Sequence, residues 1–172
     1  MGMSVIISAA DAEDAEQILK LQYLGYQAEA ELYGDWAIEP LTQTLESLRA
    51  ELSEQHFLVA RLGDEVVGTV RGHVDDDGIG RIGRLVVHPR MQRHGLGGRL
   101  LEALERRLAE DGSPEDGSPV TAYRLFTGHR SLGNLRLYAR QGYRQTAVEP
   151  VSSSLSFVHL EKPAATPYAA TA

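Results

Sequence analysis

The segment Gly83–Leu108 reads GRLVVHPRMQRHGLGGRLLEALERRL, and this stretch decides the fold. The apolar run at its start predicts a strand over Ile79–His88. Glycines at positions 95, 97 and 98 follow, and leucines then recur four residues apart at 96, 100, 104 and 108. That spacing predicts an amphipathic helix over Leu96–Ala109. A strand, a tight glycine-rich turn and a helix N-terminus therefore follow one another directly.

A turn of this kind predicts a phosphate site. Glycines let the backbone approach a ligand closely, and the amide groups at a helix N-terminus add the positive end of the helix dipole. Arg90, Arg93 and Arg99 place formal positive charge around the turn. A dinucleotide fingerprint needs a third glycine where Leu100 stands, and a P-loop needs a lysine that the segment lacks. ATP binding at this turn is therefore the weaker alternative.

The phrase Gln92-x-x-Gly95-x-Gly97, after a strand that ends in Val87-x-Pro89, resembles the pyrophosphate motif of the GNAT superfamily of N-acyltransferases. In that family the same strand pairs its backbone with the pantetheine arm of acetyl-CoA. The resemblance implies a GNAT-like α/β fold with a mixed, mostly antiparallel sheet flanked by helices. It also implies that acetyl-CoA is the cosubstrate. The binding residues that it implies are Leu85, Val86, Val87, Gln92, Arg93, His94, Gly95, Leu96, Gly97, Gly98 and Asn134.

The second matching stretch, NLRLYARQGY from Asn134 to Tyr143, resembles the motif of the family's fourth helix. Asn134 and Tyr138 are four residues apart and share one face of a helix predicted from Ser131 to Gln141. In the family the asparagine contacts pantetheine and the tyrosine hydroxyl lies near the CoA sulfur. Tyr138 is therefore the expected catalytic residue, because a phenol of pKa ~10 can protonate a thiolate whose conjugate acid has a pKa near ~8.5.

The sequence leaves the general base open. Many family members carry a glutamate on the fourth strand, where this chain has Gly83 and Arg84. The candidates are His88, His129, Glu29, Glu31 or a chain of water molecules. An oxyanion would be stabilised by a backbone N–H near Val86 or Val87, where the family strand carries a bulge.

Periodicity along the chain gives the element order β-α-α-β-β-β-α-β-α-β-β, that of a single α/β domain over residues 4–161 followed by a disordered tail over 162–172. In the first helix, which Asp11 caps, the expected apolar stripe is Ile18, Leu21, Leu24 and Ala28. The other expected elements are helices over Thr42–Leu52 and Ser131–Gln141, and strands over Ser4–Ser8, His56–Leu62, Glu65–Val74, Val120–Thr127 and Ser154–Leu160.

Composition excludes several kinds of chemistry. The 172 residues include no cysteine, so thiolate nucleophiles and disulfides are excluded. The absence of G-x-S-x-G also favours direct transfer over an acyl-enzyme. The six histidines have no metal-ligand spacing, so no metal is expected. No signal peptide or run of ~20 apolar residues is present, which predicts a cytoplasmic protein without a membrane partner. The scarcity of lysine beside many arginines, alanines and glycines suggests a bacterial source.

Charge is distributed unevenly. Residues 1–80 hold 16 Asp/Glu against 4 Lys/Arg, a balance of −12, whereas residues 81–172 hold 8 against 13, a balance of +5. The net charge of −7 opposes nucleic-acid binding. If the arginines from Arg84 onward serve the CoA phosphates, the acidic half, with Glu29, Glu31, Asp35 and Glu39, faces the second substrate.

The expected acceptor is therefore a cationic primary amine of a small molecule or peptide, and the resemblance allows a homodimer. The alternative function is a non-catalytic, regulatory acyl-CoA-binding domain of the same fold.

Overall fold

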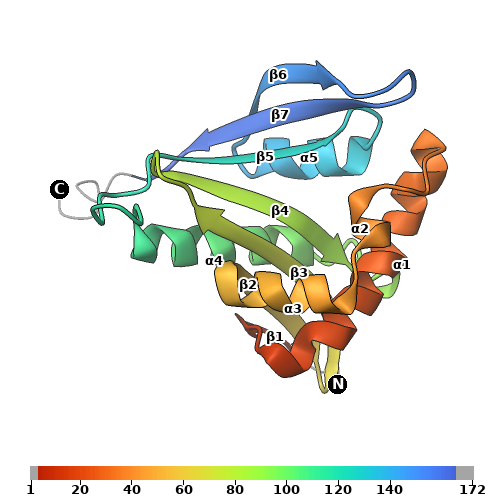
Figure 1. The fold of residues 1–172 in the computed structure, drawn as a ribbon, viewed down its shortest axis with the longest axis horizontal. Coiled ribbons are helices and arrows are strands. Elements are labelled where there is room, and N and C mark those ends of the chain that lie inside the picture. Colours follow the sequence, from red (N-terminus) through yellow and green to blue (C-terminus); the bar gives the residue numbers. More distant parts are fainter. Residues whose placement is uncertain (1–3, 166–172) are drawn as a thin grey trace. The chain divides into compact units, whose positions relative to one another are not determined.

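The computed structural model describes residues 4–165. Within them, seven strands form one mixed, mostly antiparallel sheet in the order β1-β2-β3-β4-β5-β7-β6 (Figure 1). The strands are β1 (Val5–Ala9), β2 (His56–Leu62), β3 (Glu65–Val74), β4 (Ile79–Val87), β5 (Ala122–Gly128), β6 (Arg144–Pro150) and β7 (Ser156–Pro163). The helices are α1 (Ala15–Tyr33), α2 (Glu39–Thr42), α3 (Leu45–Glu54), α4 (Leu96–Asp111) and α5 (Leu132–Arg140). This arrangement confirms the expected α/β fold.

Two compact units make up the described chain, and β3, β4 and α4 contribute to both. The first unit holds the described part of Met1–Arg71 together with Arg84–Leu104. The second holds Gly72–Gly83 and the described part of Glu105–Ala172.

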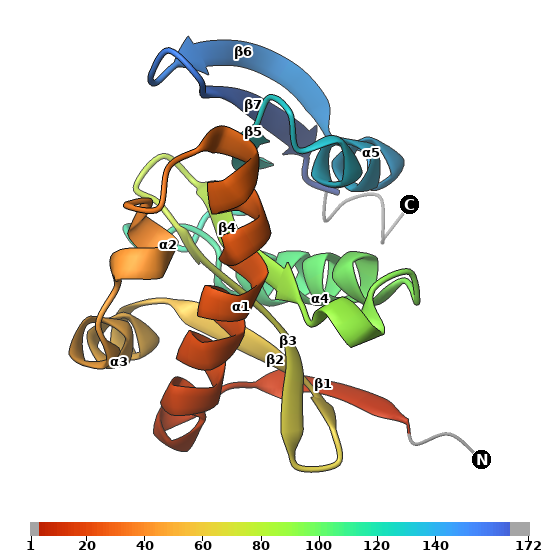
Figure 2. The ribbon, with the colours of Figure 1, turned by 90° about the vertical axis from the view of Figure 1, so that its right-hand side faces the viewer.

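In the first unit, helices cover both faces of the strands. Helices α1 and α3 lie on one side of β2 and β3, and the start of α4 lies on the other (Figure 2). Strand β1 pairs antiparallel with β2, from Val5 opposite Leu62 to Ala9 opposite Leu58. The buried apolar residues between α1, α3 and the strands form one cluster: Ala15, Ile18, Leu19, Leu21, Leu48, Phe57, Val59, Val66 and Val86.

Helix α1 follows directly on a 3₁₀ turn, Ala12–Asp14, that Asp11 caps. Asp11 and Asp14 form a capping box on this turn, in which each side chain accepts a backbone N–H of the other end of the turn. Gly34 ends the helix with φ of 66°, a conformation that glycine adopts without a steric cost. The expected stripe is right at Ile18 and Leu21.

The stripe is wrong at Leu24 and Ala28, which are both exposed. The residues that face the core at this point are Gln22, which is 2% exposed, and Gly25. Neither residue is apolar and large, so a search for apolar periodicity passes over this face. At Gly25 an added Cβ would lie 2.3 Å from Cγ1 of Val86, so α1 approaches β4 very closely there.

In the second unit, β5 pairs antiparallel with β7 along its whole length, and β7 pairs antiparallel with β6. The first residues of β4, Ile79–Arg81, run parallel to Ala122–Arg124 of β5. The second half of α4 contributes Glu105, whose carboxylate accepts hydrogen bonds from the Tyr143 hydroxyl at 2.8 Å and the Lys162 ammonium at 2.8 Å. Burial and the charge of Glu105 both raise the pKa of Tyr143.

Most elements begin and end within a few residues of the predicted positions, and β2 and β3 begin and end at the predicted residues. The single-turn helix α2 was not predicted. Strand β7 runs to Pro163, so Lys162 and Pro163 belong to the sheet and not to the expected tail, and residues 166–172 of that tail lie outside the described residues. In the range 4–165, no helix is both long enough and apolar enough to cross a membrane.

Candidate functional site

The end of β4 is held firmly in the first unit. The backbone N–H of His88 donates to the Val67 carbonyl at 2.8 Å, so pairing with β3 continues to the last residues of the strand. The His88 side chain then accepts the backbone N–H of Arg90 at its Nδ1, at 3.1 Å, and caps the short 3₁₀ turn Pro89–Met91. Val86 is 6% exposed and packs in the core, so the strand that leads into the turn is rigidly placed.

The turn between β4 and α4 reverses the chain with two left-handed residues. Arg93 has φ of 68° and Gly95 has φ of 73°. Nothing lies within 4 Å of where a Cβ would be at Gly95, so its backbone conformation, and not crowding, requires the glycine. The Gln92 side chain donates to the Val87 carbonyl at 3.3 Å and ties the turn back to the strand. Gln92, Arg93, His94 and Gly95 are all exposed.

Helix α4 begins at this exposed turn. The Arg99 N–H donates to the Gly95 carbonyl at 3.2 Å, which is the first turn of the helix. The N–H groups before Arg99 have no carbonyl behind them within the helix, and the first turn carries no acidic side chain. Leucines 96, 100, 101, 104 and 108 are all buried, as predicted, so the helix is anchored below the turn. An anionic group fits here, because amides and the helix dipole both favour negative charge.

Two of the three arginines around the turn already contact other groups of the protein. Arg90 forms an ion pair with Glu65 at 2.7 Å, and the Arg99 guanidinium donates to the Val5 carbonyl at 3.3 Å. Both side chains are exposed, so these contacts are weak and a stronger anion can compete for them. The backbone of the turn is therefore the larger part of the anion site.

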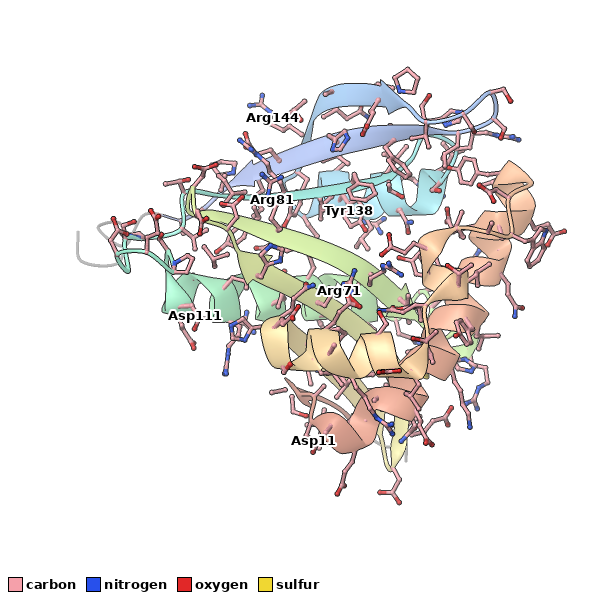
Figure 3. All side chains as sticks on the ribbon, in the orientation of Figure 1. Asp11, Arg71, Arg81, Asp111, Tyr138 and Arg144 are labelled. Atoms are coloured by element: carbon pink, nitrogen blue, oxygen red, sulfur yellow. The ribbon has the colours of Figure 1, made fainter. Side chains whose placement is uncertain are left out.

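The predicted residues of the second unit lie on α5. Asn134 is half-buried, and its amide nitrogen donates to Oγ1 of Thr127 at 3.1 Å. Tyr138, labelled in Figure 3, is 6% exposed. Its ring lies 6.0 Å from the ring of Tyr143 at 58°. Asn134 and Tyr138 thus lie on one helix, four residues apart, as predicted. The packing of Tyr138 against Tyr143 gives it a structural role besides the catalytic one predicted for it.

The structure shows a polar cluster in the first unit that the sequence did not predict. Arg84 lies on β4 with φ of 54°, and its Nη2 is 3.3 Å from Oε1 of Glu39. Arg71 on β3, labelled in Figure 3, forms an ion pair with Glu51 of α3. Gln43 also bonds to Glu51, and Gln22 donates to Gln43 at 2.9 Å. Burial and the neighbouring positive charge of Arg71 lower the pKa of Arg84.

This cluster corrects one expectation. Arg84 was grouped with the arginines that serve the CoA phosphates, but its neighbours are Glu39, Arg71, Glu51 and Tyr26. The only signal in the sequence was the departure at Gly83-Arg84 from the family's glutamate.

The candidate bases differ in their surroundings. Nδ1 of His88 is occupied as the acceptor of the Arg90 N–H. Nδ1 of His129 lies 3.0 Å from the backbone nitrogen of Ser156, which donates to it. Glu29 is half-buried and Glu31 is exposed. Within the described range, no three His, Cys, Asp or Glu side chains gather where they could hold a metal.

The second unit also contains a cavity of about 210 Å³. Its lining residues are Arg81, Ile82, Arg124, Leu125, Phe126, Thr146, His159 and Leu160. Its titratable side chains are paired: Arg81 with Asp75 at 2.8 Å, Arg124 with Glu161 at 2.6 Å and His159 with Glu149 at 2.9 Å. The protein itself supplies a partner for each of these side chains.

Comparison with known proteins identifies the family. The model of the acetyltransferase (GNAT) family matches residues 16–143. The mycothiol acetyltransferase of Saccharopolyspora erythraea is 36% identical over 105 residues, which are 57% of this chain and 34% of that protein. The chain thus corresponds to about a third of the length of that relative.

Solved structures share the fold. The PaiA N-acetyltransferase of Thermoplasma acidophilum, in complex with coenzyme A, has a TM-score of 0.73 at 20% identity, covering 94% of this chain and 99% of that one. YncA of Salmonella typhimurium, described as a putative acetyltransferase with its cofactor acetyl-CoA, has a TM-score of 0.72 at 19% identity, covering 95% of each chain.

Proposed function

Because the chain belongs to the acetyltransferase (GNAT) family, we propose that it transfers an acetyl group from acetyl-CoA directly to a primary amine of a small molecule or peptide. The observation that carries the proposal is the exposed turn between β4 and α4, in which Arg93 and Gly95 are both left-handed. Cytoplasmic location, a homodimer and a domain that begins at residue 4 stay predictions.

The residues proposed to bind acetyl-CoA divide by chemistry. The amides from Gln92 to Gly98 would bind the pyrophosphate, because they lie at the positive end of α4 and the turn Gln92–Gly95 is exposed. The backbone of Leu85, Val86 and Val87 would pair with the pantetheine arm. Asn134 would contact the same arm, although its amide nitrogen already donates to Thr127.

Acetyl-CoA supplies a thioester, whose carbonyl is open to attack by a neutral amine. Holding the amine beside the thioester supplies much of the acceleration without a covalent intermediate. A backbone N–H near Val86 or Val87 would stabilise the oxyanion that forms. As the C–S bond breaks, the Tyr138 hydroxyl would give its proton to the departing sulfur, and the nitrogen would lose one proton to a base or to water.

Binding of acetyl-CoA tests this proposal at its first step. A ligand that binds only the native state adds about 2.7 kcal/mol at 100 times its Kd. For a chain of this size that corresponds to a rise in Tm of about 5–10 °C. Thermal unfolding should be followed with acetyl-CoA and, as the comparison, with ATP at the same concentration.

Gly97→Glu should abolish the shift, because a side chain and a negative charge would occupy the position of the phosphate. Equal shifts with acetyl-CoA and ATP, or an undiminished shift in the variant, would refute the assignment of this turn.

A further inference from the structure

The guanidinium of Arg84 is buried without enough partners. Its side chain is 11% exposed, and among the described residues its Nη1 is the buried side-chain nitrogen or oxygen that has no hydrogen-bond partner. Its Nη2 has only the 3.3 Å contact with Glu39, whose side chain is 82% exposed. Buried polar groups in native proteins are almost always paired, and an orphaned charged group is costly. The unpaired nitrogen therefore calls for a partner from outside the chain.

The backbone at Arg84 carries a second cost. Its φ of 54° lies in the left-handed region, which long side chains adopt rarely. Strained residues persist where the surrounding structure holds them, and they gather at binding and catalytic sites. An unpaired charge and a strained backbone coincide at one residue.

The groups around Arg84 do not neutralise it. Arg71 is the nearest like charge, and Glu51 is already committed to Arg71 and to Gln43. Tyr26 is uncharged, because burial raises the pKa of its hydroxyl. Glu39, the other carboxylate that acts on Arg84, lies in solvent, and the half-buried Glu29 lies near Tyr26. The buried part of the cluster thus keeps one unbalanced positive charge.

Arg84 lies close to the proposed reaction. It precedes Val86 by two residues on β4, so their Cα atoms are separated by roughly 7 Å or less at about 3.3 Å per residue. Val86 and Val87 are the residues proposed above to contact acetyl-CoA and to stabilise the oxyanion. An arginine side chain can span that distance.

We propose that Arg84 binds a carboxylate of the acceptor, so that the acceptor is an amine that also carries a carboxylate, such as an amino acid. This inference rests on the proposed acetyl transfer. The planar fork of a guanidinium matches the two oxygens of a carboxylate, and the free Nη1 supplies the donor that Glu39 does not use. The inference replaces the expectation of a purely cationic acceptor, which rested on the uneven charge of the two halves of the chain and counted Arg84 among the arginines that serve the phosphates.

Products of the reaction give the sharpest test, because they carry no ionisable amine. The probes are N-acetyl-L-amino acids and the corresponding N-acetyl-L-amino acid amides, which differ only in the charge of the carboxyl end. Binding to the full chain is measured by ligand-observed NMR and calorimetry, with and without coenzyme A. The wild-type protein should bind at least one acid about 10- to 100-fold more tightly than its amide.

Four variants separate the possible causes. Arg84→Gln should bring acid and amide to within about threefold of each other, and Arg84→Lys should restore only part of the preference. Glu39→Gln should keep or increase the preference, because it removes the carboxylate that competes for Nη2. Arg81→Gln, an exposed arginine of the same strand, should leave the preference unchanged.

Two results would overturn the proposal: no acid preferred over its amide by the wild type up to about 10 mM, or a preference that survives in Arg84→Gln. The Tm shift with acetyl-CoA is measured on the same samples. If acetyl-CoA raises the Tm of the wild type as expected but no acid is preferred, only the role of Arg84 is refuted. If acetyl-CoA does not raise the Tm of the wild type, the proposed function is refuted.

Discussion

Replacing Gly25 with alanine should force α1 and β4 apart at their closest approach. The new Cβ would lie 2.3 Å from Cγ1 of Val86, and also 3.5 Å from its Cβ and 3.6 Å from its Cγ2. Contacts under 3.0 Å are essentially absent from real structures, so either the Val86 side chain or the two elements must shift by at least 0.7 Å, the difference between 3.0 and 2.3. Val86 cannot turn away easily, because a β-branched side chain is stiff at χ1 and this one is buried.

The size of the effect follows from two opposing contributions. Overpacking of a filled core costs about 1–3 kcal/mol. Alanine in the middle of a helix gains up to about 1 kcal/mol over glycine. Gly25→Ala should therefore lower the free energy of unfolding by about 0–2 kcal/mol. The displaced strand carries Val86 and Val87, so the affinity for acetyl-CoA should fall as well.

Gly133→Ala is the matched control. Gly133 lies in α5, and nothing lies within 4 Å of its would-be Cβ, so only the helical gain applies. Gly133 is the second residue of α5, so its gain is smaller than that of a mid-helix glycine, and denaturant unfolding should place Gly25→Ala about 0–3 kcal/mol below Gly133→Ala. Val86→Ala should relieve part of the loss in Gly25→Ala, so the double variant should be more stable than the sum of the single changes. A Gly25→Ala protein more stable than Gly133→Ala would show that α1 and β4 are not in this close contact.

Three further predictions concern single residues. Tyr138→Phe should slow turnover by about 10²- to 10⁴-fold with little change in acetyl-CoA affinity, and a near wild-type rate would leave Tyr138 a packing residue. Glu105→Ala should lower the free energy of unfolding by about 3 kcal/mol, because it leaves a half-buried ammonium and a buried hydroxyl without their acceptor; a loss below about 1 kcal/mol in urea unfolding would contradict this. Burial alone would raise the pKa of Asp14, but the hydrogen bond and charge of Arg61 and the Asp11 N–H lower it below 3.8. The stabilisation is therefore present above that pH and lost as pH falls through the lowered pKa, so Asp14→Asn should flatten the acid limb of stability against pH.

The sequence predicted the part of the fold that repeats a simple period. The leucines of α4 are buried because a helix that packs on one face buries every third or fourth residue, and their spacing in the sequence predicts that face. The turn before α4 was also predictable, since glycine at 95 is the residue that a left-handed turn favours.

The face of α1 was mistaken for a physical reason. Gln22 and Gly25 lie on its buried side because the glycine admits β4 and the glutamine amide bonds to Gln43 and to the Pro40 carbonyl. Such contacts depend on residues distant in the sequence, and residue type alone does not indicate them. The same holds for Arg84, whose left-handed backbone and unpaired nitrogen are set by the packing of β4 among α1, α2 and α3.

The central claim is acetyl transfer to an amine, and product analysis tests it most directly. The purified protein is incubated with acetyl-CoA labelled in the acetyl group and with a panel of amines that includes amino acids, and free CoA thiol and labelled product are both measured. The account predicts thiol release that depends on the amine, with the label recovered on nitrogen in equal amount. Acetyl-CoA that binds and stabilises the protein, with thiol release no faster than in buffer for every amine, would contradict it and would identify a non-catalytic acyl-CoA-binding domain.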